Sequence, residues 1–314
     1  MARLSYDSVE ALIFDPVPAG RTATRAALYA LGFRHTESVH SLETFLGSVA
    51  QRPPDLVLAE AHGTGEDLCG AIRQIRQGQC GENPFIVIIV TAWEKGTGLV
   101  GRVIGSGADD LLLRPFSTGL LGQRLENHIE RRKGFVVTSD YIGPDRRHDP
   151  GRTGGDRFEP PNSLKMKARE RLSAEAVARR MGAELKVARE RLSGEKLRRD
   201  VFQVCVQWRL LLEPRAGDPP LDMAGLAALA QSIAARCRDT AHAAAVEWCE
   251  AAVSAIEGQA LGVGRSATMH LLGDAALKLH AVFHPGLSQA ERLQQIDATV
   301  ALMRARNDRA ALAS

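Results

Sequence analysis

Each of four short apolar runs in the first part of the chain ends at a side chain that can carry charge or form a hydrogen bond. These side chains are Asp15, Glu60, Thr91 and Arg114. A guanidinium is planar and prefers bidentate pairing with a carboxylate. Arg114 is therefore a candidate partner for Glu60 or for Asp15, in an ion pair that needs no metal ion.

The apolar runs themselves predict a parallel sheet. They cover residues 11–14, 56–59, 85–90 and 111–113. Amphipathic helical patterns lie between them, near 21–31, 42–50, 66–75, 98–104 and 118–131. Continuous apolar strands that alternate with helices are typical of a parallel sheet covered on both faces. We therefore expect an α/β domain with right-handed crossovers.

Five short motifs occur in a fixed order between residues 8 and 132. They are Phe14-Asp15, Pro54–Glu60, Val90-Thr91-Ala92, Gly107–Asp110 and Arg114-Pro115-Phe116. In this order and spacing they make residues 8–132 resemble a response-regulator receiver domain. The resemblance implies a flavodoxin-like sheet of five parallel strands in the order 2-1-3-4-5, with a site at the carboxyl ends of the strands. It also implies a response-regulator role in two-component (phosphorelay) signalling.

The resemblance implies a site of five groups in a receiver that is phosphorylated. An Asp that ends the third strand accepts the phosphoryl group, two acidic residues after the first strand hold Mg²⁺, a hydroxyl ends the fourth strand and a Lys ends the fifth. Asp15 and Thr91 match this pattern. Glu60 replaces the phosphoacceptor, Pro16 replaces the second acidic residue and Arg114 replaces the Lys.

These replacements predict a degenerate receiver, or pseudo-receiver, that is not phosphorylated. The loss of a carboxylate at Pro16 removes charge that a hard divalent ion requires, so we expect Mg²⁺ binding to be weak or absent and no cofactor. The family's switch position, often aromatic, is Leu111. Glu60 would carry its carboxylate into the space of a phosphoryl group. Three interpretations stay open: a scaffold, a constitutive phosphorylated-like state, and residual phosphotransfer.

The remainder of the chain predicts a linker and a helical domain. Residues 133–165 are rich in Gly, Pro and charge and lack a period, although Phe135–Val137 could attach the start of this linker to the first domain. In residues 166–314, apolar positions recur at three- and four-residue steps, which predicts an all-α bundle. We expect one long helix from Ser173 to a point before Pro214. Four shorter helices should follow, near 222–238, 240–257, 266–283 and 288–308.

A basic stretch at the start of the helical part leaves an alternative open. Residues 164–199 contain 12 Lys or Arg and 5 Glu, a local charge of +7. This pattern indicates a solvated or coiled-coil helix face, an acidic partner, or a transcription regulator that binds DNA through the basic helix. The spacing of Ala178 and Gly182 resembles that of a helix-turn-helix motif, although Arg191 stands where that motif needs an apolar residue.

Composition and motifs exclude several other classes. Five scattered cysteines without a CxxC pair argue against a disulfide framework or a zinc site and favour a reducing cytoplasm. His280 and His284 lie one helical turn apart but lack a third metal ligand. No apolar run approaches the roughly 20 residues of a membrane helix, and no catalytic motif is present.

We therefore expect a cytoplasmic, non-enzymatic protein that acts through protein contacts. The expected partner is a signalling protein, either a histidine kinase or the chain's own helical domain. Homodimers are expected through the face made by the fourth helix, fifth strand and fifth helix, or through the long helix.

Overall fold

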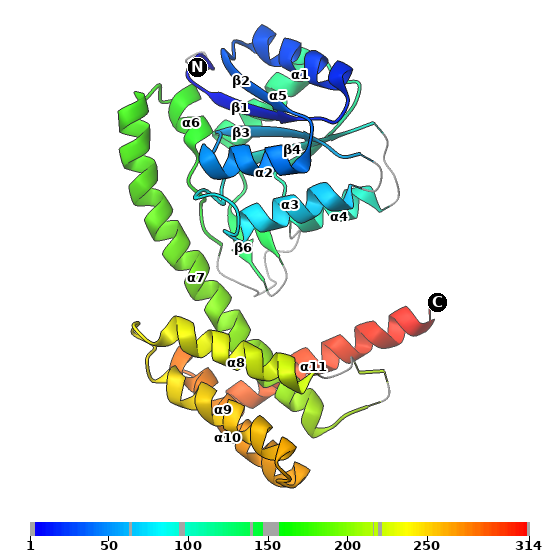
Figure 1. Ribbon diagram of the computed structural model, residues 1–314, viewed down its shortest axis with the longest axis vertical. Helices are drawn as coiled ribbons and strands as arrows, with labels where there is room; N and C mark the ends of the chain where they lie inside the picture. Colours follow the sequence, from blue (N-terminus) through cyan, green and yellow to red (C-terminus); the bar gives the residue numbers. More distant parts are fainter. Residues whose placement is uncertain are drawn as a thin grey trace. The chain divides into compact units, whose positions relative to one another are not determined.

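The computed structural model describes residues 4–62, 65–93, 98–138, 141–146, 157–215, 217–218 and 222–312. The chain divides into two compact units, Met1–Leu192 and Ser193–Ser314. Figure 1 traces the elements of each unit. Among the described residues, no helix is both long enough and apolar enough to cross a membrane.

A five-stranded parallel sheet forms the centre of the first unit (Figure 1). Its strands are β1 (Glu10–Phe14), β2 (His35–Val39), β3 (Leu56–Glu60), β4 (Val87–Ala92) and β5 (Asp110–Leu113). Their order is β2-β1-β3-β4-β5, and every neighbouring pair is parallel. The strand order expected from the receiver-like motifs is confirmed.

Helices cover both faces of this sheet. The helices α1 (Pro18–Leu31) and α5 (Thr118–Glu130) pack on one face. The other face is covered by α2 (Leu42–Gln51), α3 (Glu66–Arg76) and α4 (Leu99–Ser106). Because side chains alternate along a strand, Ala11 and Ile13 of β1 enter the first core while Leu12 and Phe14 enter the second. Every residue of β3 and β4 is buried.

The strand β2 has no counterpart among the predicted apolar runs. It lies at the edge of the sheet and pairs with β1 alone. Val39 is its one buried residue, and the other four, His-Thr-Glu-Ser, are polar. An edge strand needs no apolar run because one side of it faces solvent, so hydrophobic patterning could not reveal it.

The segment expected to be a linker, 133–165, is folded into the first unit where the structure describes it. It forms a hairpin of β6 (Phe135–Val137) and β7 (Ile142–Pro144) and reaches α6 (Ser163–Ala168). The ring of Phe85 lies 5.7 Å from that of Phe135 and 5.8 Å from that of Phe158. The expected boundaries 8–132, 133–165 and 166–314 therefore differ from the observed division after Leu192. The added core combines widely spaced apolar residues of this polar segment with Phe85 and with residues further along the chain, such as Leu192.

Two buried arginines fasten the hairpin segment to the sheet. Arg76 and Arg132 both bind the carboxylate of Asp109, at N–O distances of 2.9 to 3.1 Å. Backbone carbonyls accept their other N–H groups, and both guanidinium groups lie about 5 Å from the Phe135 ring. Burial lowers the pKa of Arg76 to about 10 despite the pull of Asp109. The charges are tolerated because nearly every polar atom has a partner.

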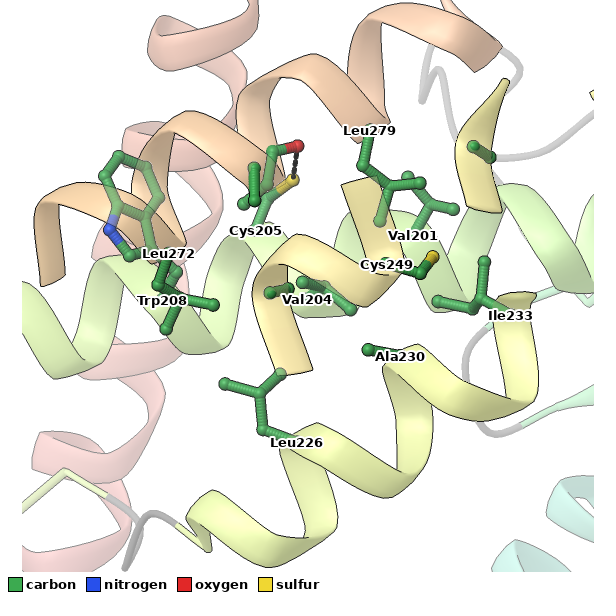
Figure 2. Close-up of a cluster of buried hydrophobic side chains, with 14 of the residues drawn as sticks. Val201, Val204, Cys205, Trp208, Leu226, Ala230, Ile233, Cys249, Leu272 and Leu279 are labelled. Carbon is green, nitrogen blue, oxygen red and sulfur yellow. Dashed lines mark hydrogen bonds between the residues drawn. The ribbon is translucent and has the colours of Figure 1, made fainter. Parts of the chain in front are cut away.

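The second unit is a bundle of helices around a main apolar core (Figure 2). It contains the end of α7 (Ala174–Leu212) and the helices α8 (Met223–Cys237), α9 (Ala245–Ala260), α10 (Arg265–Phe283) and α11 (Gln289–Leu312). A smaller apolar cluster lies between α7 and α11. The Trp208 ring packs against α10, where its Nε1 donates to the carbonyl of Met269 at 3.0 Å. The bundle and the long helix agree with the predicted all-α region.

Helix α7 runs without interruption through Gly182 and Gly194. Ala178 and Gly182 therefore do not form a helix-turn-helix motif, because both lie within one continuous helix. Several acidic and basic side chains of α7 pair with one another instead, as Arg180 does with Glu184 at 2.8 Å.

Candidate functional site

The carboxyl ends of four parallel strands bring the sequence-predicted site residues together. Asp15 follows β1, Glu60 ends β3, Thr91 lies near the end of β4 and Arg114 follows β5. Glu60 is the direct register partner of Thr91. Parallel strands end at one edge of a sheet, so residues far apart in sequence meet there. All four side chains are buried, with Arg114 the most exposed at 9%.

Glu60 is held by two donors on a single carboxylate oxygen. Its Oε2 accepts from the Nε of Arg114 at 2.6 Å and from the hydroxyl of Thr91 at 2.5 Å. Its Oε1 is buried and has no hydrogen-bond partner among the described residues. Charge-assisted hydrogen bonds of this length are the strong ones, so the arrangement fixes the side chain.

The other edge of the Arg114 guanidinium contacts helix α1 and the end of β1. Its outer nitrogen donates to the hydroxyl of Thr24 at 2.7 Å and lies 3.4 Å from Oδ2 of Asp15. Motif comparison missed Thr24. The signal in the sequence is its place on the buried face of α1, four residues after Gly20 and four before Leu28.

A glycine makes room for the Asp15 carboxylate. A Cβ at Gly20 would lie 2.0 Å from Oδ2 of Asp15, which is far inside van der Waals contact. The other oxygen of Asp15 accepts the backbone N–H of Val17 at 2.8 Å. Gly20 therefore belongs to the site, because the absence of a Cβ leaves the space that the Asp15 carboxylate occupies.

Two aromatic rings flank the buried guanidinium. The Arg114 guanidinium carbon lies 5.1 Å from the centre of the Phe116 ring and 6.0 Å from that of Trp93. Trp93 itself is 63% exposed. Aromatic faces attract a cation, so the site presents apolar surface over a charged interior.

The remaining two predicted positions do not join the charged cluster. Pro16 is exposed, and its carbonyl accepts from Arg21 at 3.2 Å. Leu111 lies on β5 opposite Val90 and packs against the core beneath α2, α3 and α4. Pro16 supplies no carboxylate, and Leu111 belongs to the apolar packing.

The donor set does not fit the Mg²⁺ ion that the receiver fold implies. The cluster holds two carboxylates, Asp15 and Glu60, and the Arg114 guanidinium contacts both. Mg²⁺ takes octahedral oxygen coordination and is usually bound by one or two carboxylates and several waters, whereas both carboxylates here already pair with a cationic side chain. The described residues contain no group of three or more His, Cys, Asp or Glu side chains arranged for a metal. The guanidinium already supplies the positive charge in this cluster.

Comparisons with known proteins give structural matches alone. No family model and no curated protein matches the chain. A chemotaxis protein of Vibrio cholerae is 16% identical and matches 38% of this chain and 98% of its own, with a TM-score of 0.34. The receiver domain of a Pseudomonas aeruginosa sensor histidine kinase, solved with magnesium, is 24% identical over 39% of this chain and 97% of its own (TM-score 0.34). A receiver protein of Pseudomonas putida is 23% identical over 40% and 98% (TM-score 0.33).

Proposed function

We propose that this chain is a two-component signalling protein whose receiver is degenerate and acts by protein contact instead of phosphorylation. The observation that carries the proposal is the contact of the Arg114 guanidinium with Glu60 and Asp15 inside the site. A phosphoacceptor carboxylate acts beside a divalent cation. Here Oε2 of Glu60 already accepts from Arg114 and Thr91, and Oε1, which has no partner among the described residues, is buried.

The same contacts support a site that stays in one conformation. Arg114, Glu60 and Thr91 join the ends of β5, β3 and β4 through one oxygen, and Thr24 adds α1 to the network. Opening it would leave buried charges without partners, which is strongly unfavourable. We infer that Glu60 and Arg114 together hold fixed charges where a regulated receiver gains and loses a phosphoryl group.

This proposal assigns a separate role to each of the two units. The first unit offers the receiver surface to a signalling partner, such as a histidine kinase or the chain's own helical unit. The second unit provides the output through its helices and carries no known catalytic motif. Dimerisation through the face formed by α4, β5 and α5 is part of the same hypothesis.

Incubation of the full chain with acetyl phosphate and Mg²⁺, followed by intact-mass spectrometry, tests the loss of phosphotransfer. We expect no added phosphoryl group on the natural chain. A phosphoryl adduct that disappears in Glu60→Gln would overturn the proposal, because this variant keeps the shape of the side chain and removes the nucleophile.

A pull-down from cell extract tests whether the site controls a partner. Natural chain and Arg114→Met are compared, with Arg124→Met as the matched control because Arg124 lies on the same unit with a half-exposed side chain. We expect Arg114→Met to lose a partner that both other proteins retain. Equal recovery of the partner by all three proteins would contradict control by the site and would mean that the receiver serves only as a scaffold.

A further inference from the structure

A buried histidine in the second unit has one ring nitrogen without a hydrogen-bond partner in the described part of the chain. His280 lies on α10 and is 1% exposed. Its Nδ1 has no partner among the described residues. The ring is stacked on that of His284, with 4.5 Å between centroids, and lies 5.7 Å from the ring of Phe202. The imidazole is therefore buried against two rings, in surroundings that favour its neutral form.

The charged groups around His280 would repel a second positive charge. His284, four residues further along, directly follows the end of α10. From α11, Arg292 acts on both histidines, and from α7, Arg198 acts on His284. Glu195 is the one acidic group that acts on either, and it pairs with Arg198. The ring of His242 lies 4.4 Å from that of Phe283, also on α10.

The helices that meet at this histidine also share the core of the unit. Cys205 of α7 donates to the carbonyl of Ala276 on α10 at 3.3 Å (Figure 2). Leu279, the residue before His280, projects into the same cluster as Val201 and Ile233 (Figure 2). A change in the charge of His280 would therefore affect the buried contact between α10 and the helices packed against it, and not an exposed surface.

We propose that His280 is a proton-sensitive lock, and that its protonation loosens the packing of α10 against α7 and α11. This device is independent of the receiver site proposed above, because all of its members lie within the second unit. Uptake of one proton from solvent places a cation beside Arg292 with no acidic partner for it. The second unit thereby gains a response to acid that requires no phosphorylation of the first.

The sign of the effect follows from the direction of the shift. Burial, His284 and Arg292 lower the pKa of His280 to about 4 from its usual 6.5. The unfolded chain therefore takes up this proton before the folded chain does. Stability is fully present above about pH 6.5 and declines as the pH falls toward 4. One linked proton changes the folding equilibrium constant about tenfold per pH unit.

Urea unfolding of the full chain at pH 7.5, 6 and 5 measures this linkage. A Trp93→Phe background leaves Trp208 and Trp248, both in the second unit, as fluorescence probes. Between pH 6 and 5 we expect the folding equilibrium constant to fall roughly tenfold more in the parent than in His280→Gln. His270→Gln, which alters an exposed histidine of the same helix, should follow the parent.

A direct titration keeps the proposal testable if His280→Gln fails to fold. Imidazole ¹³C–¹H resonances of the natural chain, assigned through the exposed histidine variants, report the protonation of each ring. We expect the His280 ring to remain neutral at pH 5.5. Ordinary titration of His280 near pH 6.5, or equal pH slopes in parent and His280→Gln, would overturn the proposal.

Discussion

The guanidinium of Arg114 meets the carboxylate of Glu60 at 2.6 Å, although 54 residues separate them in the chain. Strand β4 lies between β3 and β5 in the sheet. Thr91, at the end of β4, donates to the same oxygen of Glu60. One oxygen atom thus joins three strand ends, and both charges of the pair are almost fully buried.

Removal of Arg114 should destabilise the first unit severely. Arg114→Ala leaves the carboxylates of Glu60 and Asp15 buried without a counter-charge, a loss of about 3–5 kcal/mol in the free energy of unfolding. Arg124→Ala removes a half-exposed arginine near Asp110 and should cost less than about 1 kcal/mol. Urea unfolding of both variants makes the comparison. Similar losses for the two would mean that the buried pair has no special role.

Addition of one methyl group at Gly20 should displace the Asp15 carboxylate. The new Cβ of Gly20→Ala would lie 2.0 Å from Oδ2 of Asp15, and overpacking of this kind typically costs about 1–3 kcal/mol. Gly47→Ala is the control, since no atom lies within 4 Å of its new Cβ in α2. That variant should gain about 0.5–1 kcal/mol. Thermal unfolding of both variants compares their stabilities. An unchanged stability in Gly20→Ala would contradict the close contact between Gly20 and the Asp15 carboxylate.

Asp109 and Asp110 are neighbours in sequence but should respond very differently to replacement. Asp109→Ala leaves Arg76 and Arg132 buried without a carboxylate, which should cost about 3–5 kcal/mol. Asp110→Ala affects a partly exposed pair with Arg124 and should cost less than about 1 kcal/mol. Urea unfolding at pH 7 measures the free energy of unfolding of both variants. Similar losses in the two would contradict the prediction.

The Asp109 carboxyl also predicts a loss of stability in acid. Burial alone would raise its pKa, but Arg132 and Arg76 outweigh burial and lower the pKa below the ordinary value. The stabilisation is therefore present above about pH 4 and declines as the pH falls through the lowered pKa. A series of unfolding curves from pH 5 to 2 should show a smaller pH dependence in Asp109→Asn than in the natural chain.

Trp208 needs a glycine on the opposing helix. A Cβ at Gly273 of α10 would lie 2.5 Å from the indole ring, so Gly273→Ala should destabilise the second unit by about 1–3 kcal/mol. Gly194→Ala, in α7 and with no atom within 4 Å of the new Cβ, should stabilise it by about 0.5–1 kcal/mol. Trp208 fluorescence during urea unfolding reports both. An unchanged midpoint for Gly273→Ala would be inconsistent with the observed helix contact.

Arg171 adopts a backbone conformation that suits glycine. Its φ of +54° is the one positive value at a non-glycine residue in the described chain, in the turn between α6 and α7. Because a side chain at this φ costs roughly 1 kcal/mol, Arg171→Gly should be more stable than Arg171→Ala by about that amount. The two variants lose the same side-chain contacts, so their difference in melting temperature isolates the backbone term. Equal melting temperatures would exclude strain at this turn.

The receiver-like sheet could be predicted from the sequence because its interior strands are covered on both faces. Such strands must be apolar throughout, and the runs at 56–59 and 85–90 therefore stand out. The edge strand β2 escaped because solvent covers one side of it. The hairpin was not predicted either, since Phe135 and Phe158 are buried by residues far from them in sequence, among them Phe85 and Leu192.

For the site, the amino-acid order was sufficient to predict which chemical groups stand at the strand ends. Glu60, Pro16 and Arg114 could be read directly as departures from a phosphorylatable receiver. The partners of Arg114 could be identified only from the folded chain, in which one nitrogen binds Glu60 and another contacts Asp15 and Thr24. Residue type limits what a side chain can bind, whereas the choice of partner depends on distances set by packing. A helix face and a missing Cβ at Gly20 placed those partners within reach.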